Sequence, residues 1–196
     1  MNIIGILGDI GSGKSFIAKQ FGYPVFNADA EVAKLYRKSR KCYYKLKKIL
    51  PNYITSFPVK KIKLSKAIMD NQQNLKKIIK IVHPEVRSSM NNFIKKNKNK
   101  KFVILDIPLL IENKINKKND ILIFVDAKKK EINKRLKKKN NINPKIVKKF
   151  KKLQLPVEFK KQKSDFIIKN NFMNKSIKKN VKRVLQKILL NARNYT

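Results

Sequence analysis

The chain has 196 residues, enough for one domain with a well-packed core, and it carries a formal net charge of +38. Its single cysteine, Cys42, excludes a disulfide framework and a cysteine-rich metal site. No segment approaches the roughly 20 apolar residues of a membrane-spanning helix, so we expect a cytoplasmic protein without a membrane partner.

The positive charge is carried by lysine rather than arginine, with 44 lysines, 6 arginines and 22 asparagines spread along the whole chain. Surfaces that bind nucleic acid usually recruit arginine, because its planar fork donates two hydrogen bonds at once. The lysine runs at 128–130, 137–139 and 148–149 lie in helical patterns and indicate solvated faces. We expect no nucleic-acid partner, but a positive field that gathers polyphosphate substrates. We also expect a monomer, with weak self-association left open.

A glycine-rich turn follows the first predicted strand, residues 3–7. Residues 8–15 read Gly-Asp-Ile-Gly-Ser-Gly-Lys-Ser and match the phosphate-binding P-loop, and a helical pattern over 14–21 follows. Glycines let such a loop wrap its N–H groups round phosphates, Lys14 reaches the β- and γ-phosphates, and the Ser15 hydroxyl binds Mg²⁺. The alternative is an ordinary glycine-rich turn in which Ser15 caps the helix. The complete pattern predicts a nucleoside triphosphate site formed by Gly11, Ser12, Gly13, Lys14, Ser15 and Phe16.

Short apolar runs then alternate with longer helical patterns. Further strands are predicted at 24–27, 102–106, 121–125 and 166–168, and helices at 29–50, 62–80, 84–97, 128–139, 143–153 and 173–192. The runs at 102–106 and 121–125 are almost wholly apolar, as in a parallel sheet covered on both faces. This alternation predicts an α/β fold with the nucleotide at the carboxyl ends of the strands.

Two stretches interrupt the alternation. Residues 30–100 contain helical patterns only and are predicted to form a helical substrate lobe, and residues 128–163 are lysine-rich and helical, as in a lid. The core of a single domain spanning 1–196 would then comprise 1–29, 101–127 and 164–196.

Two acidic residues mark the ends of predicted strands. Asp29 lies two residues after the strand at 24–27, where its carboxylate could accept the proton of an acceptor hydroxyl, or simply cap the next helix. The spacing leaves both interpretations open. Asp106 ends the strand at 102–106, where P-loop proteins often place a carboxylate that holds Mg²⁺.

Three further residues each have a functional and a structural interpretation. His83 is the single histidine and precedes Pro84, which fits the first turn of a helix; such a histidine more often packs or caps than binds. Glu112 is either a helix-face charge or a contact in the substrate lobe. Arg135 either stabilises charge on a transferring phosphoryl group or is an ordinary exposed helix residue.

From Ile3 to Asn171 the chain resembles the dephospho-CoA kinases. Several family motifs recur in the same order and at matching separations, and their combination is specific although the P-loop alone is not. They are the glycine-rich string at 5–15, Asn27-Ala28-Asp29, His83-Pro84, Pro108-Leu109-Leu110-Ile111-Glu112, the lid arginine Arg135, Gln154 and the string Ser164–Asn170.

The resemblance implies a P-loop NTPase three-layer sandwich with a parallel five-stranded sheet, a helical substrate lobe and a helical lid. It implies ATP-dependent phosphorylation of the ribose 3′-hydroxyl of dephospho-CoA, which gives CoA and ADP in the last step of CoA biosynthesis, with ATP and Mg²⁺ as cofactors. The site residues that follow are Asp29 as base, Lys14 and Arg135 as charge stabilisers, Lys61, His83 and Arg87 for the acceptor, Asn170 for adenine, and Ser15 and Asp106 for Mg²⁺.

The chain also departs from the family pattern. Leu7 replaces threonine, Asp9 glycine and Asn27 aspartate, while Lys61, Lys139 and Lys160 stand where arginines are usual. Lysine keeps the charge but loses the bidentate fork, so we expect a weaker grip on phosphate. Two other functions stay open: another small-molecule P-loop kinase acting on a nucleoside or nucleotide, and a basic nucleic-acid-binding P-loop protein.

Overall fold

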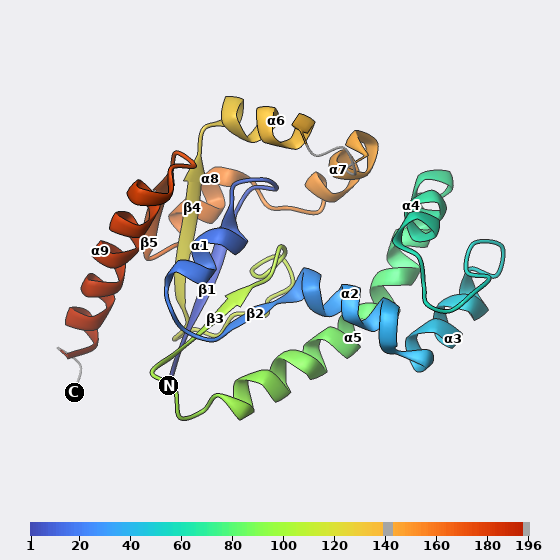
Figure 1. Ribbon diagram of the computed structural model, residues 1–196, viewed down its shortest axis with the longest axis horizontal. Coiled ribbons are helices and arrows are strands. Elements are labelled where there is room, and N and C mark those ends of the chain that lie inside the picture. Colours follow the sequence, from blue (N-terminus) through green and yellow to red (C-terminus); the bar gives the residue numbers. More distant parts are fainter. Residues whose placement is uncertain (139–142, 194–196) are drawn as a thin grey trace. The chain divides into compact units, whose positions relative to one another are not determined.

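The computed structural model describes residues 1–138 and 143–193 (Figure 1). The chain divides into two compact units, each with its own internal contacts. We call them the sheet unit, Met1–Phe26, Asn97–Ile142 and Phe150–Thr196, and the helical unit, Asn27–Lys96 and Asn143–Lys149. Within the described residues, no helix is both long enough and apolar enough to cross a membrane.

The sheet has five parallel strands in the order β2-β3-β1-β4-β5, which confirms the predicted α/β fold. The strands span Asn2–Gly8 (β1), Val25–Asn27 (β2), Phe102–Asp106 (β3), Ile121–Ala127 (β4) and Phe166–Asn170 (β5). All five residues of β3 are buried, because helices or loops cover both faces of the sheet. The predicted strands agree with the observed ones within two residues at each end.

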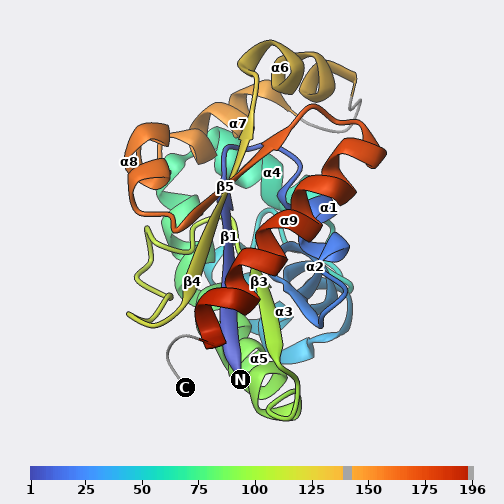
Figure 2. The ribbon, with the colours of Figure 1, turned by 90° about the vertical axis from the view of Figure 1, so that its left-hand side faces the viewer.

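One face of the sheet packs against α1 (Lys14–Gln20) and α9 (Asn174–Arg193), and Figure 2 shows α9 running across it. Their apolar side chains, among them Ile17 and Val181, form one buried cluster with Ile4, Ile6 and Ile104 of the strands. Burial of such side chains contributes about 1.5–3 kcal/mol each and fixes the two helices against the strands.

Three more helices follow β4: α6 (Lys129–Lys138), α7 (Pro144–Lys151) and α8 (Val157–Gln162). The first two correspond to predicted helices. The third was missed because its six residues are too few to show a helical period.

The helical unit contains α2 (Ala28–Lys38), α3 (Arg40–Ile49), α4 (Lys61–Asp70), α5 (Gln72–Lys96) and most of α7. The single helix predicted over 29–50 is two helices, because the Ser39 side chain accepts a hydrogen bond from the Cys42 N–H at 3.1 Å and caps a new helix.

The prediction that Pro84 opens a helix was wrong. The chain breaks instead at Asn71, and α5 runs for 25 residues with Pro84 inside it. A proline inside a helix costs about 3 kcal/mol or more, but the apolar face of α5 continues across it, with Ile78, Val82 and Met90 all buried. Their combined burial outweighs that cost.

Candidate functional site

The P-loop lies between β1 and α1, and its glycines Gly11 and Gly13 are closely packed by neighbouring side chains. Gly11 and Gly13 have φ of 86° and 90°, in the left-handed region that favours glycine. A Cβ atom on Gly11 would lie 3.1–3.2 Å from Leu136 and Ile132 of α6, and one on Gly13 would lie 2.5 Å from the Asn170 amide nitrogen. The loop backbone is therefore held in place from both sides.

Asn170, the last residue of β5, ties the P-loop to the following turn. Its Nδ2 donates to the Ser12 carbonyl at 2.7 Å and its Oδ1 accepts from the Phe172 N–H at 2.8 Å. The side chain is almost fully buried. The structure therefore places this residue, which the resemblance assigns to adenine, in contact with the loop that would hold the phosphates.

The P-loop also offers donors to an anion. The Lys14 ammonium donates to the carbonyls of Gly8 and Asp9 at 3.1 and 2.8 Å, so it lies over the loop itself. The Ser12 hydroxyl is completely buried and finds no hydrogen-bond partner among the described residues. A buried polar group without a partner is rare and calls for an explanation. The donor set fits a phosphate group.

Ser15 and Asp106 supply the oxygen atoms that a magnesium ion would need. Ser15 is the second residue of α1, and Gly13 occupies the N-cap position, so the alternative in which Ser15 caps the helix is wrong. Asp106 is buried at the carboxyl end of β3. A hydroxyl and a carboxylate are the hard oxygen ligands that Mg²⁺ prefers. The described residues contain no group of three His, Cys, Asp or Glu side chains for a metal, so phosphate and water would complete the shell.

Asp9 stands where the family has a glycine, and its carboxylate contacts the next residue of the loop and a lysine of α7. Oδ1 accepts from the Ile10 N–H at 2.6 Å, and Oδ2 lies 3.8 Å from the Lys151 ammonium. The lysine offsets the negative charge that the substitution brings into the loop.

Arg135 lies on α6, the helix that packs on Gly11. Its guanidinium carbon lies 4.4 Å from the centroid of the Phe172 ring, within the range of a cation–π contact. Phe172 was missed by the sequence analysis, and the one signal for it was its place directly after the strand that ends in Asn170.

Glu112 and Lys160 form a buried ion pair in the sheet unit, with Oε1 and Nζ 3.6 Å apart. The side chains are only 7% and 2% exposed. Glu112 also accepts from the Leu155 N–H at 3.2 Å, and the lysine donates to Gln154 Oε1 at 3.1 Å. Glu112 is therefore an internal partner, neither a helix-face charge nor a contact in the substrate lobe. Lys139, another lysine at a family arginine position, lies outside the described residues.

Asp29 belongs to the helical unit and does not cap α2. The cap is Asn27, whose side chain accepts from the Ala30 N–H at 2.7 Å. Asp29 is the second residue of the helix and is exposed. The capping alternative for Asp29 is therefore wrong, and its assignment as a base stays a prediction.

His83 and Arg87 line an open cavity of about 400 Å³ on α5. Its other lining residues are Ile79, Lys80 and Pro84. Burial, reinforced by the nearby Arg87, lowers the pKa of His83, so the imidazole is neutral near pH 7. Lys80 was not predicted as a site residue, because a helix break between it and Arg87 hid their common face.

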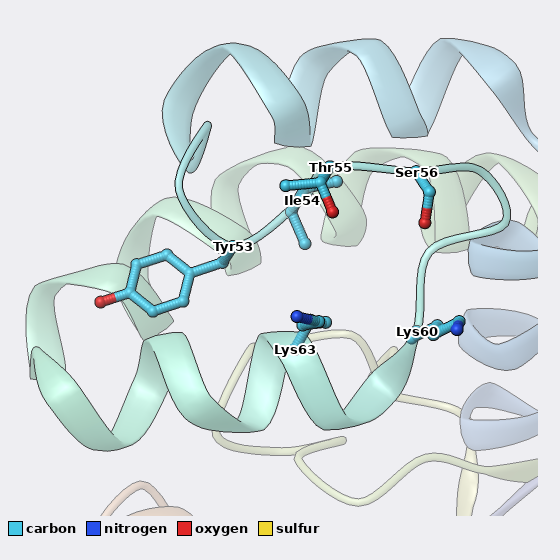
Figure 3. A pocket seen from close by; sticks show the side chains of 6 residues that line it. All are labelled: Tyr53, Ile54, Thr55, Ser56, Lys60 and Lys63. Atoms are coloured by element: carbon cyan, nitrogen blue, oxygen red, sulfur yellow. The ribbon is translucent and has the colours of Figure 1, made fainter.

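Lys61 is the exposed first residue of α4 and lines neither this cavity nor the small pocket beside it in sequence. Figure 3 shows that small pocket, with Lys60 and Lys63 at the start of α4 and Tyr53–Ser56 on the preceding loop. Its volume is about 10 Å³, which holds one water molecule. It is too small for a nucleotide-sized acceptor, so the cavity on α5 is the better candidate in this unit.

Comparison with known proteins supports one family for both units. The family model for dephospho-CoA kinase matches residues 2–176. The dephospho-CoA kinase of Wolbachia sp. subsp. Brugia malayi is 35% identical over 195 residues, covering 97% of this chain and all of the relative.

Solved structures agree on the fold. TT1252 from Thermus thermophilus superposes with a TM-score of 0.74 at 26% identity, covering 97% of both chains. A dephospho-CoA kinase from Campylobacter jejuni gives a TM-score of 0.62 at 23% identity, covering 95% of this chain and 97% of that one. Taken with the P-loop geometry and the family motifs, these matches show that this chain belongs to the dephospho-CoA kinase family.

Proposed function

We propose that this protein transfers the γ-phosphoryl group of ATP to the ribose 3′-hydroxyl of dephospho-CoA, giving CoA and ADP. The observation that carries the proposal is the P-loop. Its Lys14 ammonium and its buried Ser12 hydroxyl, which has no hydrogen-bond partner in the described part of the chain, fit a polyphosphate. Membership of the dephospho-CoA kinase family selects the acceptor.

In the sheet unit, the P-loop residues Gly11–Phe16 bind the phosphates, and Asn170 holds the loop through the Ser12 carbonyl. Lys14 and Arg135 neutralise the charge that spreads over the phosphoryl oxygens during transfer. Ser15 and Asp106 would hold Mg²⁺, which when bound draws charge from the β- and γ-phosphates. No covalent nucleophile is needed, because phosphoryl transfer asks mainly for positioning and electrostatic stabilisation.

In the helical unit, Asp29 accepts the proton of the 3′-hydroxyl while that oxygen attacks phosphorus and ADP leaves. His83 and Arg87, which line the cavity on α5, hold the diphosphate and adenosine of the acceptor. Lys61 does not line that cavity and would add a positive charge from the start of α4. Two cations suit a diphosphate, and a neutral His83 donates or accepts a hydrogen bond without adding charge. We add Lys80 to this group, because it lines the same cavity as His83 and Arg87.

A coupled ADP-release assay tests the function. Dephospho-CoA is compared with nucleosides and nucleoside monophosphates, with and without Mg²⁺, and the product is identified by mass and by its 3′-phosphate. We expect turnover with dephospho-CoA that is lost on chelation. Faster turnover of a nucleoside or nucleotide would instead support the alternative small-molecule kinase.

We further propose that the protein works as a cytoplasmic monomer without a nucleic-acid partner. Light scattering after gel filtration measures the mass in solution. Binding of duplex DNA should be weak and should collapse between low and physiological salt, since it would rest on exposed lysines alone. Tight binding at about 0.15 M salt would favour the nucleic-acid-binding alternative.

A further inference from the structure

Phe172 adopts a backbone conformation that its side chain disfavours. Its φ is 63°, in the left-handed region where a bulky residue is an outlier. The hydrogen bond from its N–H to Asn170 Oδ1 holds the turn in this conformation. Strained positions of this kind concentrate where a side chain must be aimed at a site.

The strained turn brings the Phe172 ring against the P-loop. A ring atom, Cε1, lies 3.5 Å from the position that a Cβ on Gly13 would take, which is ordinary van der Waals contact. The Arg135 guanidinium lies over the same ring, with its central carbon 4.4 Å from the ring centroid. One aromatic side chain therefore lies beside the P-loop and contacts the arginine assigned to the transferring group.

The kind of contact matters for what Arg135 can still do. Within the described part of the chain, Arg135 takes part in no ion pair. A carboxylate partner would occupy the N–H donors of the guanidinium, whereas an aromatic ring attracts its flat face. Stacking thus orients a long, flexible side chain and leaves its N–H donors available for hydrogen bonds to phosphate oxygens.

We propose that Phe172 is a positioning residue for phosphoryl transfer: it holds the Arg135 guanidinium beside the P-loop with its hydrogen-bond donors available. This inference rests on the role proposed above for Arg135. Phe172 itself touches no reacting atom.

Four variants test the proposal: Phe172→Leu, Phe172→Tyr, Arg135→Ala and the double variant Phe172→Leu/Arg135→Ala. Phe172→Leu keeps an apolar side chain but removes the π face, so kcat should fall roughly 3- to 10-fold, the range expected for a cation–π contact, with KM for ATP little changed. Phe172→Tyr should restore most of the lost rate. The double variant should be no slower than Arg135→Ala, because the ring acts through the arginine.

Phe159→Leu is the matched control, since Phe159 is also partly exposed and has the Lys163 ammonium 5.7 Å from its ring centroid, but lies on α8. It should leave kcat unchanged. A normal kcat for Phe172→Leu, or a loss explained by a lower melting temperature, would overturn the proposal. So would a double variant slower than Arg135→Ala with a raised KM for ATP, which would mean that the ring contacts the nucleotide. A fully active Arg135→Ala would instead refute the proposed role of Arg135 itself.

Discussion

The candidate sites of the two units differ in kind: one is formed by the backbone of a loop and the other by side chains on a helix. In the sheet unit the site is a backbone loop between buried side chains, with Gly13 against Asn170 and Gly11 against Ile132. In the helical unit the site consists of side chains on helix faces, with Lys80 and Arg87 both exposed.

The difference indicates how each site responds to change. A loop held on both sides cannot adjust, and phosphoryl transfer loses rate steeply when the reacting groups are displaced. Exposed cations on a helix share the binding of one anionic ligand, so the loss of one weakens binding by a limited factor. We therefore expect large losses of turnover from the P-loop and graded losses of acceptor affinity from α5.

The largest effect is expected for Lys14→Ala. The variant should keep its fold, because Lys14 is not part of the buried core, and should lose all but a few per cent of turnover. Activity and melting temperature are measured beside Lys19→Ala, an exposed lysine on the same helix. Substantial activity in Lys14→Ala would refute the assignment of the loop.

Asp29→Asn tests whether an exposed residue of the helical unit can nevertheless be essential. Asparagine cannot take the proton of the acceptor hydroxyl, so kcat should fall by at least ~10²-fold. The melting temperature should not change, because Asn27 caps the helix. As a control, Asn27→Ala should lose about 1 kcal/mol of stability. If Asp29→Asn turns over normally, the base has to be sought elsewhere, with Asp106 the first candidate.

Lys160→Met tests the buried charges of the sheet unit. It leaves Glu112 without its cation, and removing one partner of a buried pair costs about 3–5 kcal/mol of unfolding free energy. The neighbouring Lys161 pairs with Asp126 and Glu158 at the surface. Lys161→Met should therefore cost at most ~1 kcal/mol. Denaturant unfolding compares the two, and equal losses would show that burial of the pair does not matter.

Arg87→Leu tests the graded response of the helical unit. Loss of one charged hydrogen bond corresponds to about 1.5 kcal/mol, so KM for dephospho-CoA should rise roughly tenfold while KM for ATP stays the same. Lys80→Met should act in the same direction. Lys96→Met is the control. Lys96 lies on the same helix, about 24 Å from Lys80 at 1.5 Å per residue, so this variant should leave both KM values unchanged. A raised KM for ATP in Arg87→Leu would mean that Arg87 acts on ATP and not on the acceptor.

The smallest effect concerns His83 and pH. The unfolded chain takes up a proton on this histidine near the ordinary pKa of 6.5, whereas in the fold the pKa lies lower. The buried, neutral His83 therefore does not reduce the stability of the fold above about pH 6.5. As the pH falls from there through the lowered pKa, the unfolded chain binds the proton first, and stability is lost. Melting temperatures between pH 5 and 8 should show a steeper acid decline for the wild type than for His83→Gln. If the melting temperatures of the two proteins fall equally with pH, His83 is not a buried group with a lowered pKa.

Much of the sheet unit was predictable because its signals are local. The P-loop pattern and the apolar strands are read directly from neighbouring residues, and the strands were predicted within two residues. What failed depends on contacts distant in sequence. Proline predicts a helix start locally, and only the buried face of α5 shows that the helix continues through Pro84.

The site residues divide in the same way. Lys14 and Ser15 were predicted from a motif, whereas Phe172 became a candidate only through its ring contact with an arginine 37 positions earlier in the sequence. Likewise Asn27 rather than Asp29 caps α2 because the helix begins at Ala28, a boundary that spacing does not reveal. Ring contacts between distant residues and exact helix boundaries are known only once the path of the backbone is known.

The contact between α6 and Gly11 bears on how this family can be recombined. Leu136 and Ile132 would lie only 3.1–3.2 Å from a Cβ atom at position 11, so a side chain there would push on α6, and the P-loop and α6 have closely matched surfaces. A chimera that takes its lid from a relative with the junction before Lys129 would mix two unmatched surfaces at the nucleotide site. A junction after Lys138 would carry both surfaces over as one piece.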